Sequence, residues 1–114
     1  MRKKPREKLP LRRWKKTTLE ALIHRAIVDT EDPEEQQMGF YEALEEHLRF
    51  PFKTQLAGVP VVVRGLDIGE DNEVMAVCVR DGERVGVPLL DLPIPKPPPK
   101  GAEWIEAFRL WVSE

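Results

Sequence analysis

Acidic side chains are the residues of this sequence whose type and spacing could do chemistry. They gather in three short segments, which contain Asp29, Asp32, Glu34 and Glu35; Glu42, Glu45 and Glu46; and Asp67, Glu70, Asp71 and Glu73. Ca²⁺ binds oxygen ligands and takes roughly six to eight of them. Each segment is therefore a candidate part of a calcium site, provided that another element brings further oxygen atoms to it.

None of the three segments is an EF-hand. Pro33 interrupts the loop that would follow Asp29, no glycine stands at the sixth loop position, and the segment after Asp67 lacks alternating acids. A structural role is equally open, because carboxylates are common at the start of any helix and on its solvated face. Asp32 fits such a role as a helix cap. Asp29 does not, and it is the first residue that we expect to bind a metal ion.

Other kinds of chemistry have few residues to use. His24 and His47 are the two histidines, neither lies in a catalytic motif, and the chain has no glycine-rich phosphate loop. Cys78 is the single cysteine, which excludes a disulfide within the chain and a zinc site built from several cysteines. We therefore expect that the protein is not an enzyme.

Charge is distributed unevenly along the chain. Residues 1–16 hold nine Lys or Arg against Glu7 alone, so that the net charge of -2 leaves -10 for residues 17–114. A block of like charge with two prolines predicts a flexible basic arm, whose cations include Arg2, Lys3, Lys4, Arg6, Arg12, Arg13, Lys15 and Lys16. An acidic body attracts cations, whereas a basic arm favours nucleic acid.

Length and composition predict one domain over residues 17–114. The chain has 114 residues, of which 41% are hydrophobic and 33% are charged, as in a globular protein with a highly charged surface. No apolar run is long enough for a membrane span or a signal peptide. We therefore expect a cytoplasmic protein without a membrane partner.

Two helices are predicted in residues 17–50. Thr17 and Glu20 fit a capping box before a helix over about 18–28, and Asp32 with Pro33 predicts the start of a second helix over about 33–48. At 100° per residue, the apolar face of the second helix is opposite to Glu35, Glu42 and Glu46. Glu34 and Glu45 fall at the margin of the apolar face beside Tyr41, where another element could approach them.

Valine-rich segments predict strands in residues 51–92. They cover 59–66, 74–80 and 84–90, with a further short strand over 52–56, and Asp81-Gly82 is typical of a hairpin turn. Short strands of this number predict a small SH3-like β-barrel and an α+β fold. The proline-rich residues 93–100 then form a spacer before a C-terminal helix over 101–114.

Several consecutive motifs resemble the CcbP family of calcium-binding proteins. They are Val28-Asp29, then Pro33-Glu34-Glu35 with Met38-Gly39-Phe40-Tyr41, then Leu44-Glu45, then Phe50-Pro51-Phe52, and later Gly86-Val87-Pro88-Leu89. The resemblance covers about residues 22–114 and leaves the basic arm outside. It implies a small bacterial protein that binds Ca²⁺ without EF-hands, as a buffer or a sensor.

The resemblance also implies candidate ligands, since Asp29, Glu34, Glu35 and Glu45 match acids of the family motif. With Asp32 they form the predicted metal set, and Asp67, Glu70 and Asp71 form a second possible cluster. An alternative hypothesis is a module that binds a protein through its barrel or nucleic acid through its basic arm.

Overall fold

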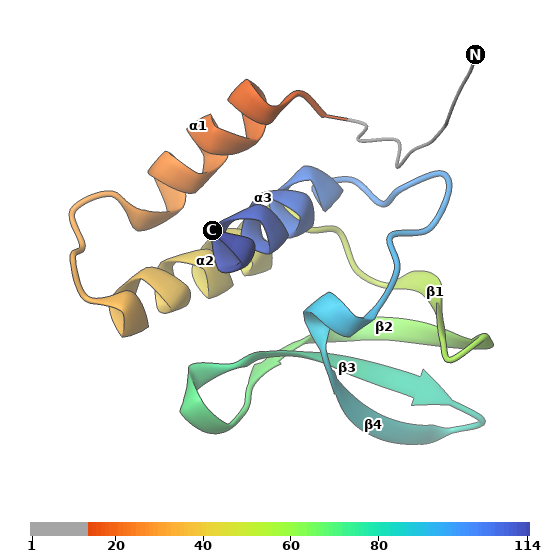
Figure 1. Cartoon of the computed structure of the whole chain (residues 1–114). Coiled ribbons are helices and arrows are strands. Elements are labelled where there is room, and N and C mark those ends of the chain that lie inside the picture. The colour runs from red at the N-terminus through yellow and green to blue at the C-terminus, as the bar shows by residue number, and fades with distance from the viewer. Residues whose placement is uncertain (1–13) are drawn as a thin grey trace, which may run out of the picture.

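Residues 14–114 form two layers, with three helices on one side of a four-stranded sheet (Figure 1). This computed structural model describes residues 14–114, so most of the predicted basic arm, including Arg2, Lys3, Lys4, Arg6, Arg12 and Arg13, lies outside the described residues. Within those residues, no helix is long and apolar enough to cross a membrane.

The helices follow the predicted apolar patterns closely. They are α1 (Lys16–Ile27), α2 (Pro33–His47) and α3 (Ala102–Ser113). At the start of α2, Asp32 accepts a hydrogen bond from the backbone N–H of Glu34 at 3.2 Å, and proline occupies the first turn, as predicted. The start of α1 differs, because the helix already begins at Lys16 and no side chain caps it, so the predicted capping box at Thr17 is wrong.

The sheet is an antiparallel meander of β1 (Phe52–Leu56), β2 (Val59–Ile68), β3 (Val74–Arg80) and β4 (Glu83–Pro88). Short 3₁₀ turns, η1 (Glu70–Asn72) and η2 (Leu89–Asp91), follow β2 and β4. The strand order is β1-β2-β3-β4 and the two outer strands do not pair, so the sheet is open. The α+β class is confirmed, whereas the predicted closed SH3-like barrel is not.

The core lies between the sheet and the helices. Alternate residues of the two central strands point into it, namely Val61, Val63, Val74, Ala76 and Cys78, as period-two alternation requires. From the helical layer, Phe40 of α2 packs against Phe108 and Trp111 of α3, with ring centroids 5.2 Å apart in both pairs.

Two glycines allow the helices to approach one another closely. A Cβ at Gly39 would collide with the carbonyl of Ala26, so a glycine lets α2 lie against the end of α1. Gly101 has a φ of +90°, and a Cβ there would collide with the carbonyl of His47. This contact places the start of α3 beside the end of α2, and Arg49 N–H donates to the Lys100 carbonyl next to it at 2.9 Å.

Candidate metal site

The start of α2 exposes the first predicted group of acids. Asp32 uses one carboxylate oxygen as the helix cap, and Glu34 and Glu35 occupy the first turn. Asp29 lies in the preceding loop with a φ of 64°, a left-handed conformation that aspartate tolerates better than most residues. All four side chains are exposed, so their carboxylates are accessible to an ion from solvent.

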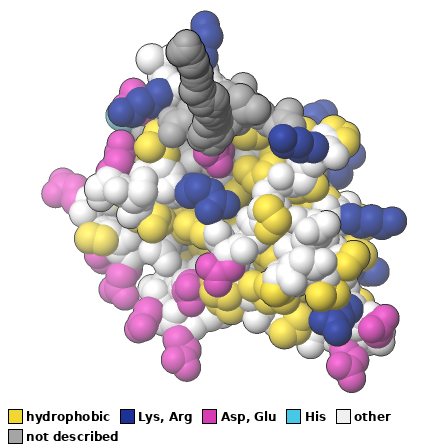
Figure 2. All heavy atoms as spheres, turned by 45° about the vertical axis from the view of Figure 1, so that its right-hand side comes forward, with side chains coloured by type: hydrophobic (Ala, Val, Ile, Leu, Met, Phe, Trp, Pro, Cys, Tyr) yellow, Lys and Arg dark blue, Asp and Glu magenta, His cyan; other side chains and the backbone are white. Residues whose placement is uncertain are grey.

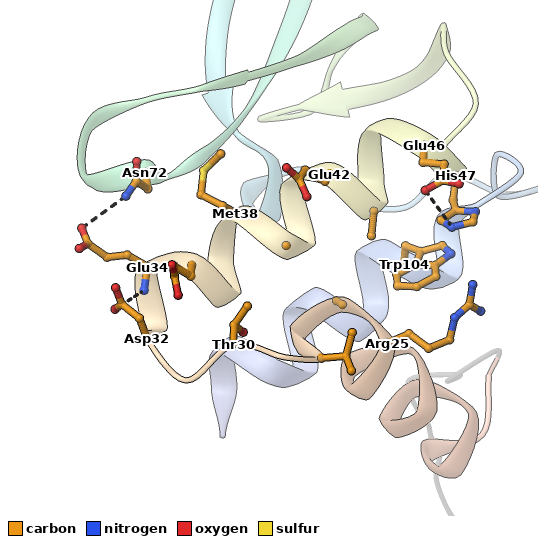
Figure 3. A pocket seen from close by; sticks show the side chains of 15 residues that line it. Arg25, Thr30, Asp32, Glu34, Met38, Glu42, Glu46, His47, Asn72 and Trp104 are labelled. Carbon is orange, nitrogen blue, oxygen red and sulfur yellow. Dashed lines mark hydrogen bonds and ion pairs between the residues drawn. The ribbon is translucent and has the colours of Figure 1, made fainter.

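The turn η1 approaches the start of α2. Asp71 and Asn72 adopt left-handed conformations with φ of 55° and 59°, which reverse the chain between β2 and β3. Gln37 Nε2 donates to the backbone carbonyl of Asn72 at 2.7 Å, and Asn72 Nδ2 donates to Glu34 Oε2 at 3.4 Å (Figure 3). The third acidic segment of the sequence is thereby attached to the first.

A second meeting point lies further along α2. The pKa of the Tyr41 phenol is raised above 10.0, first by burial and then by the negative charges of Glu45 and Asp67. The charges of one carboxylate from α2 and one from β2 thus act on the same phenol. The two elements that meet here, α2 and the β2–η1 segment, contain five of the predicted acids, Glu34, Glu45, Asp67, Glu70 and Asp71, and we call this boundary the acidic seam.

The acidic seam distributes its carboxylates over two places. Glu34 and Glu45 are separated by eleven residues, or about 16 Å along a helix at ~1.5 Å per residue, too far apart to share one ion. One end therefore combines Glu34 with η1, and the other combines Glu45 with Asp67. In residues 14–114, no three His, Cys, Asp or Glu side chains lie close enough together to hold a metal ion.

The donor atoms at the two ends still fit Ca²⁺ in kind. Carboxylate, amide and backbone carbonyl oxygens are the hard ligands that this ion takes, and exposed sites leave room for coordinating water. At the α2–η1 end, the Asn72 side-chain amide already donates to Glu34, and Gln37 of the same helix donates to the Asn72 backbone carbonyl. An ion bound there would draw its other ligands from Asp32, Glu70, Asp71 or water.

A groove lies along α2 on the side facing α1, with a volume of about 750 Å³ (Figure 3). Five carboxylates line it, from Asp32, Glu34, Glu35, Glu42 and Glu46. At one end the His47 ring stacks on Trp104, with centroids 4.7 Å apart, and the Arg25 guanidinium lies 5.2 Å from the centroid of the Trp104 ring. We call this feature the acidic groove; it meets the acidic seam at Glu34 and Asn72.

The predicted site residues are thus divided between these features. Glu34, Glu45, Asp67, Glu70 and Asp71 lie along the acidic seam, and Asp32 and Glu35 line the groove. The side chain of Asp29 makes no hydrogen bond or ion pair with another described residue, so its role stays a prediction. Of the basic residues predicted in the arm, the structure describes Lys15, exposed before α1, and Lys16, the first residue of α1.

The sequence did not predict Asn72 at these features, and it predicted a different setting for Glu42 and Glu46. The acidic pattern contains only Asp and Glu, so it did not include Asn72, although an asparagine beside Asp71 is typical of a tight turn. Glu42 and Glu46 were taken as solvent-facing, and they are exposed, but the packing of α1 against Gly39 turns their face of the helix into a groove wall.

The comparisons with known proteins agree with this architecture. The chain is similar over 89% of its length to the chain in the crystal structure of Anabaena CcbP, of which it covers 94%, with a TM-score of 0.71 and 22% sequence identity. That likeness shows the fold. No curated protein matches the sequence. A family model described as calcium binding, Calci_bind_CcbP, matches residues 20–112. The chain belongs to the CcbP family of calcium-binding proteins.

Proposed function

We propose that the protein binds Ca²⁺ along the acidic seam and acts as a calcium buffer of modest affinity. The observation that carries the proposal is the hydrogen bond from Asn72 to Glu34, which joins η1 to α2. These two residues are 38 positions apart in the sequence, so it is the fold that brings them together. Their contact supplies the second element that a carboxylate-rich helix start needs in order to hold a divalent ion.

The helix dipole decides on which side of α2 the first ion lies. The N-terminus of a helix carries about half a positive charge, which opposes a cation placed on the helix axis. Asp32, the N-cap, and Glu34, in the first turn, lie next to this end of the helix. The favourable position is therefore beside the helix, towards Glu70 and Asp71 of η1, where the acids of both elements act together.

A second ion would lie between Glu45 and Asp67. After burial, the charges of both carboxylates contribute to the raised pKa of the Tyr41 phenol, which supports placing a cation between them. Exposed carboxylates and few preformed ligands favour modest affinity, because each bound side chain loses rotamer freedom. Modest affinity is sufficient for a calcium buffer, whereas a sensor would also need an element that changes between two conformations.

A titration of the full chain with CaCl₂, followed by amide chemical shifts, tests the proposal. We expect saturable shifts at Glu34 and Asn72 and at Tyr41 and Glu45, two sets of signals on the two ends of the seam. The β3–β4 turn at Asp81 and Glu83 is a control, since it carries exposed acids that belong to neither end. Equal shifts at that turn, or none in the seam at millimolar Ca²⁺, would contradict the proposal.

A further inference from the structure

The acidic groove has more negative charge than the residues around it neutralise. Its five carboxylates face one guanidinium, that of Arg25, and the His47 ring, which contacts Glu46 at 3.9 Å. Among the described residues, the side chains of Glu35 and Glu42 make no hydrogen bond or ion pair. A groove of about 750 Å³ with this lining suits an elongated, cationic occupant.

The walls also favour a peptide over a small ion. Between the carboxylates the lining is apolar or small, with Ala26, Val28, Met38, Gly39 and Ala43. Arginine and lysine side chains combine apolar stems with charged ends, so they can cover such a floor while their charges reach the carboxylates. Figure 2 shows one face of the molecule, on which acidic side chains are more frequent on the left and basic ones on the right.

The chain supplies a segment with the matching charge. Residues 1–13 contain seven Lys or Arg against a single Glu and connect directly to Trp14, which packs partly buried against the core. Since α1 and α2 run in roughly opposite directions (Figure 1), the start of α1, from which the segment continues, lies toward the His47 end of α2 and not toward its Asp32 end. The charge of residues 1–13 and the place where they join α1 therefore both favour this segment as the occupant of the acidic groove.

The length of the segment is sufficient. From His47 back to Asp32 the groove follows fifteen residues of α2, or about 22 Å at ~1.5 Å per residue. Thirteen residues in extended form reach roughly 43 Å at ~3.3 Å per residue. The segment is therefore long enough to pass the start of α1 and still reach the carboxylates at the far end of the groove, Asp32 and Glu34.

We propose that residues 1–13 bind in the acidic groove of the same molecule and compete with Ca²⁺ for the end of the seam at Glu34. The inference rests on the proposed calcium function. It adds an internal competitor that lowers calcium affinity at low ionic strength and loses its effect as salt screens the charges. The family match begins at residue 20, so the proposed competitor, residues 1–13, lies outside the family pattern.

The test neutralises four cations in the full chain, Arg2, Lys3, Lys4 and Arg6, each changed to Gln. A matched control changes four exposed cations away from the groove to Gln, namely Lys53, Arg80, Arg84 and Lys96. Both variants alter the net charge equally. At about 20 mM salt we expect the first to bind Ca²⁺ roughly fivefold more tightly than the parent chain and the control less than twofold, with both differences gone at about 0.5 M salt.

Amide chemical shifts test binding in the groove without calcium. We expect the four arm substitutions to shift Glu42, Ala43 and Glu46, whereas the control leaves them unchanged. Shifts confined to residues 15–20, or equal affinity gains in both variants, overturn the proposal. Groove shifts that grow with protein concentration overturn it in favour of a second copy as the source of the segment. If no chain binds Ca²⁺, the proposed function fails, and the groove shifts alone decide whether the segment binds there.

Discussion

Glu34→Gln and Glu45→Gln should each weaken one calcium site and leave the other intact. The two residues lie on the same helix and have the same side chain, but about 16 Å of helix separates them. Glu34 faces η1, whereas Glu45 lies with Asp67 near Tyr41. Glutamine keeps the size of the side chain and removes its charge, so each substitution measures the charge alone.

Coulomb's law gives the size of the effect. A divalent ion ~4 Å from a carboxylate in water gains about 2 kcal/mol, and screening at ~0.15 M salt leaves about 1.2 kcal/mol. That corresponds to a loss of roughly eightfold in the affinity of the nearer site. At ~16 Å the same expression leaves less than ~0.1 kcal/mol, which is not measurable.

Calcium titrations of both variants, followed by amide shifts at Asn72 and at Tyr41, separate the two sites in one experiment. Glu34→Gln should weaken the response at Asn72, and Glu45→Gln the response at Tyr41. Glu83→Gln, on the exposed β3–β4 turn, removes one charge that belongs to neither site and serves as the control. If either variant weakens both responses equally, the carboxylates act on one shared ion or through net charge, and the two-site reasoning is refuted.

Three further predictions concern single residues. Tyr41 is the only tyrosine, so an absorbance titration should show that its phenol ionises above pH 10.0 and that Ca²⁺ lowers its pKa by neutralising the adjacent carboxylates. Because the unfolded chain ionises at lower pH than the folded one, stability should fall as the pH rises above 10.0, and less so in Tyr41→Phe. Gly39→Ala should destabilise the fold by about 2 kcal/mol in urea unfolding, against the usual gain of alanine in a helix, because its Cβ collides with the carbonyl of Ala26. Gly65→Ala, where a Cβ meets nothing within 4 Å, is its control and should change stability by less than ~1 kcal/mol. Burial raises the pKa of the Cys78 thiol, so a thiol reagent should modify it only at the rate of unfolding, and rapid modification of the folded chain would contradict its burial.

Local signals in the sequence were sufficient to predict most elements. Asp32 and Pro33 set the start of α2, and Pro51 after Phe50 limits its other end, because these residues act on the backbone within one turn. The strand predictions also hold, since Val74 to Arg80 alternates between core and surface as expected. Element types of this kind depend on near neighbours, which the sequence displays directly.

The barrel was not confirmed because closure is a non-local property. Four strands can close only if the two outer strands pair, and nothing in Phe52–Leu56 or Glu83–Pro88 specifies that partner. In the fold, the helices cover one face of the sheet instead, and Leu19, Phe40 and Leu44 supply the core that a closed barrel would otherwise form by itself. The helical layer makes closure unnecessary.

The site was predictable to the extent that helix geometry determines it. The position of Glu34 and Glu45 at the margin beside Tyr41 follows from 100° per residue, and another element does meet that margin at both places. Which element arrives is decided by the length of β2 and by two left-handed residues at η1, 38 positions away from Glu34. A pattern in one sequence indicates contacts between near neighbours, so it could not predict a contact between residues this far apart.

The same geometry explains why one helix can serve two charged surfaces. Its faces repeat every 3.6 residues, so α2 can place Phe40 and Leu44 in the core, Glu34 and Glu45 on the seam, and Glu42 and Glu46 on the groove. Seam and groove converge only at the start of the helix, where Asp32, Glu34 and Asn72 lie together. A cation in the groove therefore affects the Glu34 end of the seam more strongly than the Glu45 end. Neutralising the arm should accordingly strengthen calcium binding at Asn72 and leave the response at Tyr41 nearly unchanged, whereas an equal gain at both would mean that net charge alone is responsible.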